Sequence, residues 1–131
     1  MGSFSDYWEN EVLDHLFGKG GYSPPTIYVG LSTAEPGDDG TGLSEPSGDG
    51  YVRVATSPAD WSAASGGALV NADAIEFPEA ADAWGTVTHF ALFDAAWGGH
   101  VLAHGALAEP KSIDLGDGAR FAAGDLEISL D

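Results

Sequence analysis

Two apolar runs separated by a short glycine-rich connection most restrict how this chain can fold. Residues 87–94 and 100–107 are each of strand length, and the connection between them, 95–99, ends in two glycines. Two such runs joined by a loop of four or five residues are typical of a β-hairpin. Because this is the densest apolar segment of the sequence, we expect it to form the centre of a sheet.

Other short segments have the composition of strands, and turn residues separate them. Residues 26–32 place Ile27, Val29 and Leu31 on one face, and residues 126–130 alternate apolar with polar side chains. About eight short strands with turn signals between them favour a mainly β fold, an antiparallel β-sandwich of jelly-roll type, over an α/β fold. The remaining expected strands are 51–56, 68–71, 74–77, 111–115 and 119–122.

The N-terminal segment 1–18 differs from the rest because its apolar residues recur with the period of a helix. This spacing predicts a short amphipathic helix over residues 4–17, capped by Ser3 or Ser5 and ended by Gly18. We expect the helix to lie on the sheet or to serve as an arm that docks on another subunit, since terminal elements are easily exchanged. The periodic residues are Phe4, Trp8, Val12 and Leu16.

Size and charge limit the classes of protein and partner. A chain of 131 residues has the length of one domain, so we expect 1–131 to form a single β-sandwich. Its net charge of −17 repels phosphate backbones and anionic lipids, so we expect no nucleic-acid partner and no membrane. Such an acidic chain suits solubility at high concentration or in high salt, and the alternative is a basic partner or bound divalent cations.

A long acidic loop over residues 33–50 contains almost nothing that a core could use. Its carboxylates Asp38, Asp39 and Asp49 are weak candidate ligands for a divalent cation, because hard cations take oxygen ligands. Their spacing does not match a calcium-binding loop, so a solvated loop is the alternative. Loops of this length are usually functional or mobile. We expect no other metal and no cofactor.

The histidines of the expected hairpin raise the question of catalysis. If Phe93 pairs with His100, the antiparallel register places His89 opposite His104, where the two rings could hold a metal. Ordinary packing and surface hydrogen bonding are the alternative. The sequence contains no Gly-x-Ser-x-Gly elbow, and no spacing selects a pair of carboxylates. We therefore expect no catalytic residues and no enzyme activity.

Three tryptophans lie in or beside expected loops: Trp61, Trp84 and Trp97. Such side chains can stack on sugars, as in lectin-like sandwiches, or anchor a protein interface. The alternative is that they fold back over the edge of the core.

Five strings of residues follow one another along nearly the whole chain, and the most specific is Trp-Gly-Thr-Val-Thr-His-Phe at 84–90. Together they resemble a family of small proteins of tailed phages and prophages that are usually labelled tail fibre proteins. The five strings are Asp14–Gly18, Tyr22–Pro36, Gly50–Arg53, Phe77–Ala80 and Trp84–Asp94.

The resemblance implies a non-enzymatic structural protein of a tailed virus particle, associated with the tail or tail fibre and present as symmetric oligomers. The expected partners are other copies of itself and neighbouring virion proteins. Its expected location is the virion, after assembly in the host cytoplasm. A capsid decoration or turret protein of the same virion is one alternative, and a carbohydrate-binding module for host-surface glycans is another. The high acid content suggests a virus of a saline host.

Overall fold

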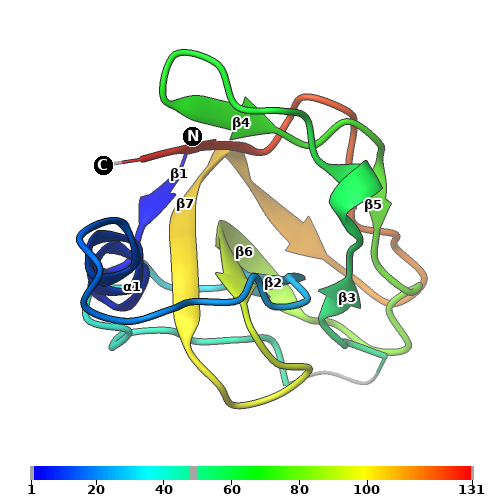
Figure 1. Cartoon of the computed structure of the whole chain (residues 1–131). Helices are drawn as coiled ribbons and strands as arrows, with labels where there is room; N and C mark the ends of the chain where they lie inside the picture. Colours follow the sequence, from blue (N-terminus) through cyan, green and yellow to red (C-terminus); the bar gives the residue numbers. More distant parts are fainter. Residues whose placement is uncertain (1, 48–49, 131) are drawn as a thin grey trace.

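Figure 1 shows the computed structural model of the chain, which describes residues 2–47 and 50–130. Short strands make up most of the regular structure, and one helix stands at the side. The strands are β1 (Gly2–Phe4), β2 (Tyr28–Ser32), β3 (Val54–Ala55), β4 (Ala68–Val70), β5 (Ile75–Glu76), β6 (Gly85–Phe93), β7 (Val101–Ile113), β8 (Arg120–Phe121) and β9 (Glu127–Ser129); the helices are α1 (Asp6–Leu16) and the single 3₁₀ turn η1 (Pro58–Asp60).

The strands form a curled seven-stranded mixed sheet in the order β3-β2-β6-β7-β1-β9-β4 and a two-stranded sheet, β5-β8. The core lies between them, as contacts between aromatic rings show. Phe90 of β6 lies 6.3 Å, between ring centroids, from Phe121 of β8, and Phe121 lies 6.2 Å from Phe77. The predicted mainly β fold with one short N-terminal helix is confirmed. The fully buried residues include Val29, Leu31, Val87, Phe90, Leu92, Leu102, Ile113 and Leu126.

Strands β6 and β7 form the predicted hairpin at the centre of the large sheet. Its expected register is wrong: His89 pairs with Ala106, and His104 pairs with Ala91. Strand β7 begins only after His100, and an irregularity at Leu92 shifts the pairing further. The two histidines are therefore not directly opposite each other. Strand β7 is also longer than expected, because it includes most of the strand predicted separately over residues 111–115.

Strand β1 is an element that the sequence did not indicate. It pairs antiparallel with β7 and parallel with β9, with Gly2 opposite Gly105 and Ile128, so the two ends of the chain lie side by side. The parallel pair makes the sheet mixed rather than wholly antiparallel. A Cβ atom on Gly2 would stand 2.6 Å from Cζ of Phe90 and 2.8 Å from the carbonyl oxygen of His104, so only glycine fits there.

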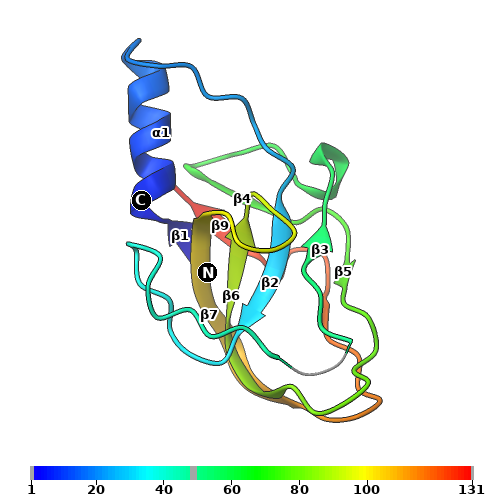
Figure 2. The same ribbon diagram turned by 90° about the horizontal axis from the view of Figure 1, so that it is seen from below.

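Helix α1 follows β1 at Ser5 and projects beyond the sheet (Figure 2). Ser5 is the N-cap, as one of the two predictions had it: its hydroxyl accepts from the backbone N–H of Trp8 and donates to the carbonyl of Val101. The helix is shorter than the predicted 4–17, since Phe4 belongs to β1, and of the two expected placements the sheet holds only its first half, because Leu16 is 69% exposed. No helix among the described residues is long and apolar enough to cross a membrane.

The described part of the acidic loop, residues 33–47, packs on the outer face of the sheet. Pro36 is fully buried, and Leu43 packs against a small cluster that contains Ala91 and Phe93. The backbone N–H of Asp6 donates to the carbonyl of Asp38, which ties the loop to the start of α1. This part of the loop is anchored at a few apolar positions, while more than half of its residues are exposed.

Candidate interaction surface

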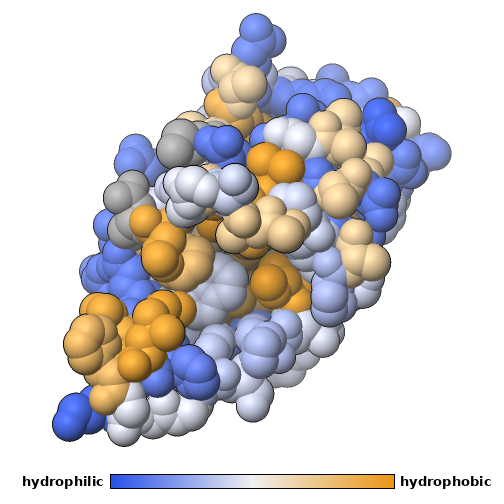
Figure 3. Space-filling model, turned by 45° about the horizontal axis from the view of Figure 1, so that its top comes forward, coloured by the Kyte–Doolittle hydropathy of each residue, from blue (hydrophilic) through white to orange (hydrophobic). Residues whose placement is uncertain are grey.

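An apolar groove of about 650 Å³ opens beside the base of helix α1. Its lining residues include Phe4 and Trp8 near the start of the chain, Trp61, and Leu130 directly after β9. Every lining residue among those that the structure describes is uncharged, although the chain carries 21 acidic residues. Figure 3 shows apolar side chains gathered on this face. The groove is therefore suited to an apolar occupant.

Hydrogen bonds fix the two tryptophans of the groove. The indole N–H of Trp8 donates to the hydroxyl of Tyr22 at 3.2 Å, and the ring centroid of Trp8 lies 4.4 Å from that of Phe4. The indole N–H of Trp61 donates to Oγ1 of Thr56 at 2.9 Å. With their polar atoms satisfied within the chain, the rings present apolar surface to the groove. The structure thus brings together Phe4 and Trp8, which the sequence suggested as part of a helix face for another subunit, and Trp61, which it suggested as a glycan or interface contact.

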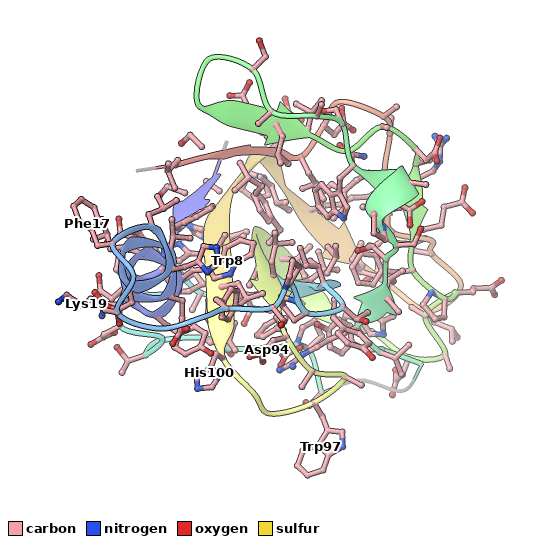
Figure 4. All side chains as sticks on the ribbon, viewed as in Figure 1. Trp8, Phe17, Lys19, Asp94, Trp97 and His100 are labelled. Carbon is pink, nitrogen blue, oxygen red and sulfur yellow. The ribbon has the colours of Figure 1, made fainter. Side chains whose placement is uncertain are left out.

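The far end of α1 exposes large apolar side chains. Leu13, Leu16 and Phe17 are 54%, 69% and 75% exposed, whereas Val12 is half-buried. Figure 4 shows Phe17 and Lys19 pointing away from the body of the protein, and Trp8 pointing into it. The first half of the helix is anchored to the sheet, and its last turns have no cover within the described part of the chain.

A third exposed apolar feature is Trp97, at the tip of the β6–β7 loop. It is 85% exposed and points away from the protein (Figure 4). Arg53 holds the loop on both sides of this residue, since its Nη1 donates to the carbonyl oxygens of Ala95 and Gly98, each at 2.9 Å. The guanidinium also lies 3.4 Å from the ring centroid of Phe93. The loop backbone on both sides of Trp97 is therefore held in place, and its ring is presented to solvent.

Arg53 is itself held by a carboxylate. Its Nη2 lies 2.6 Å from Oε1 of Glu45, and its Nε donates to Oε2 at 3.0 Å, so the ion pair is bidentate. The hydroxyl of Tyr51 donates to the same Oε2 at 2.6 Å. Burial opposes ionisation of Glu45, but the bonds from Arg53 and Tyr51 outweigh it and hold the pKa of the carboxyl below its ordinary value. Burial and the Glu45 carboxylate raise the pKa of Tyr51.

A second polar cluster joins the β6–β7 loop to α1. The carboxylate of Asp94 accepts from the backbone N–H of His100 at 2.8 Å and lies 2.9 Å from Nδ1 of its ring. The ring of Tyr7 stacks on the imidazole of His100 with centroids 3.8 Å apart. Although burial raises the pKa of Asp94, these hydrogen bonds hold it below its ordinary value. The loop and the helix are thus fixed to each other.

The candidate cation ligands have other partners in the structure. Oδ1 of Asp38 lies 2.9 Å from Nε2 of His104, and Oδ1 of Asp39 accepts from the backbone N–H and hydroxyl of Thr41. Asp49 lies outside the described residues. Within the described ranges, no group of three or more histidine, aspartate or glutamate side chains is placed to hold a metal ion. His89, the other histidine considered, is bonded to the Thr88 hydroxyl.

The three loop tryptophans have different environments. Trp84 is only 4% exposed and makes edge contacts with Tyr51 and Phe77, so it belongs to the core and offers no surface to a glycan or partner. Trp61 is half-buried in the groove wall, and Trp97 is exposed. The Arg53 network that holds Trp97 was missed from the sequence. The one available signal was an arginine in a chain with only four Lys and Arg residues.

The fold and these surfaces define a small β-rich protein with apolar sites suited to binding other proteins. The profile of a family described as Podophage GP4 fiber I protein gp80 matches residues 3–129. Because this match spans nearly the whole chain, the protein belongs to that family of phage fibre proteins. The resemblance to phage tail fibre proteins is confirmed, and the chain belongs to a family of virion components. No curated protein matches the chain.

Proposed function

We propose that the protein is a non-enzymatic structural component of a phage tail fibre and that its copies assemble into a symmetric oligomer in the host cytoplasm. The observation that carries this proposal is the exposed apolar end of α1. Contiguous exposed apolar surface on a small protein usually marks an interaction site. Membership of a fibre family supplies the context, in which partners are other copies and neighbouring virion proteins.

The polar clusters support a structural role. Glu45, Tyr51 and Arg53 hold one loop, and Asp94 with His100 holds another. Each cluster connects parts of the chain that are distant in sequence, and its members use their hydrogen-bonding capacity on each other. This is the arrangement that a protein needs to present a fixed surface to neighbours.

Two measurements test the proposal. Sedimentation velocity of the purified chain should show a defined species of more than one copy, and a monomer at all concentrations would contradict the oligomer. Gold-labelled antibodies on intact virions should mark the tail fibre. Labelling over the capsid would instead support a decoration or turret protein, and labelling of neither would contradict a place in the particle.

A second candidate function is binding of host-surface glycans, and the observation that favours it is Trp97. An aromatic ring that is 85% exposed, on a loop whose backbone is held on both sides of it, can stack on a sugar without the cost of ordering the loop. A panel of host glycans should then shift tryptophan fluorescence, and Trp97→Ala should remove the shift. A stable oligomer whose fluorescence is indifferent to glycans would leave only the structural function.

A further inference from the structure

We propose that the apolar groove of one copy receives the exposed end of helix α1 of a second copy, so that the copies join head to tail. This inference rests on the proposed function, because it names the contact through which the structural oligomer forms. It concerns two surfaces of one chain, the helix end (Leu13, Leu16 and Phe17) and the groove beside Trp8 and Trp61.

The helix end has the pattern of a segment that docks in a groove. Leu13, Leu16 and Phe17 stand at positions i, i+3 and i+4, which places them on one face. All three are more than half exposed. An apolar face with this spacing, laid into a hydrophobic groove, is a common mode of peptide recognition.

The groove matches such an occupant in character and size. Its lining consists of apolar, aromatic, proline and small hydroxyl side chains, and Ile27 and Leu69 are among the aliphatic ones. Its volume of about 650 Å³ lies within the range of about 300–1,000 Å³ that is usual for binding pockets. A few large apolar side chains can therefore enter it without leaving a buried charge unpaired.

The distribution of charge is compatible with a second copy as the occupant. Lys19 follows the helix end and, like Lys111, makes no ion pair with another described residue, whereas Arg53 and Arg120 are paired with Glu45 and Glu76 within the chain. A free cation beside an apolar face fits an acidic partner, and the chain itself has a net charge of −17. Two such chains can approach closely only at an uncharged surface, which the groove provides.

The arrangement within one chain requires the contact to be intermolecular. Trp8 forms part of the groove wall, and Leu16 lies two turns further along the same helix, about 12 Å from it along the axis. Figure 2 shows the helix running outward beyond the sheet, so its end cannot fold back into its own groove. A contact between two different surfaces is heterologous, and it closes into a ring when the rotation between copies permits.

Cross-linking tests the contact directly, because the native chain contains no cysteine. We expect a mixture of the full-length variants Leu16→Cys and Leu130→Cys to form dimers with a short bismaleimide reagent. Leu130 lines the groove and is 59% exposed. Each variant alone should cross-link far less. A mixture of Leu115→Cys and Leu130→Cys is the matched control, since Leu115 is as exposed as Leu16 but lies on neither surface.

Three leucine-to-glutamate variants test the same contact by sedimentation. Leu16→Glu and Leu130→Glu should each weaken self-association by about tenfold or more, because each places a charge in an apolar contact. Leu115→Glu adds the same charge and should change association much less. Equal effects of all three, or no cross-link above the control, would overturn the proposed contact while leaving an oligomer of another geometry. A native chain that stays monomeric would overturn the proposed function as well.

Discussion

At the residue scale, Arg53 is the side chain on which most of the loop structure depends. Its side chain is only 6% exposed, and its guanidinium binds the Glu45 carboxylate, two loop carbonyls and the face of Phe93. Without Arg53, the half-buried Glu45 carboxylate and the two loop carbonyl oxygens would lose the hydrogen bonds that it donates. The rigidity of the exposed Trp97 loop therefore follows from one buried cation in a chain that has few.

We expect Arg53→Met to lower the free energy of unfolding by about 3 kcal/mol, because it leaves the Glu45 carboxylate without its charged partner. Urea denaturation followed by circular dichroism measures this change. The matched control is Arg120→Met, whose ion pair with Glu76 is more than half exposed on both sides and should contribute less than about 1 kcal/mol. Equal losses in the two variants would contradict the role assigned to Arg53.

The lowered pKa of Glu45 predicts how stability depends on pH. A carboxyl whose pKa is lower in the folded than in the unfolded state contributes stability above its unfolded pKa, near 4.5, and loses it as pH falls through the folded value. Glu45→Gln should therefore be less stable than the native chain at pH 7, and the difference should shrink below about pH 4. Unfolding free energies of both chains from pH 3 to 7 measure it, and a constant difference would contradict this assignment.

The Arg53 network shows why single residues were difficult to predict. Glu45 and Tyr51 are close to Arg53 in sequence, but Ala95 and Gly98 are not, and only the folded hairpin brings their carbonyls to the guanidinium. Composition correctly marked Trp97 as a loop residue. It could not show that Trp84, in a similar stretch, turns into the core.

At the element scale, Ser5 joins helix α1 to the sheet. It is 1% exposed, and its hydroxyl donates to the carbonyl of Val101 while accepting from the N–H of Trp8. We expect Ser5→Ala to cost about 1–2 kcal/mol of unfolding free energy, the usual value for a lost N-cap. Ser3→Ala is the control, because the Ser3 side chain makes no hydrogen bond with another described residue. Equal stabilities would contradict the capping role.

Elements with strong local patterns were predicted well, and those that depend on distant partners were not. The hairpin and the helix have runs of periodic apolar residues, so their places were found from sequence alone. Strand β1 has three residues and exists because β7 and β9 flank it. In the loop over residues 33–47, the sequence did not indicate the anchoring at Pro36 and Leu43, because it depends on the outer face of the folded sheet.

At the scale of the whole molecule, the sequence indicated which class of partner the protein has, but not which surface binds that partner. The net charge of −17 argues against nucleic acid and anionic lipid, and the family match places the chain among phage fibre proteins. The groove brings together residues from the first strand to the last, from Phe4 to Leu130, so no local pattern could reveal it. The same two facts, strong uniform charge and a neutral apolar groove, determine how copies should respond to salt.

We expect self-association to strengthen as salt rises from about 0.05 M to 1 M, because the screening length falls from more than 10 Å to about 3 Å. Lys19 is the one cation that the proposed contact brings to the partner, so it adds little electrostatic attraction. Each chain carries 17 net negative charges, and the two chains therefore repel each other. Screening by salt removes more of this repulsion than of the attraction. Sedimentation velocity across this range measures the dissociation constant. Leu16→Glu should associate weakly even at 1 M salt, since the apolar contact itself is impaired. Association that weakens with salt would mean that ion pairs, and not the apolar groove, hold the copies together.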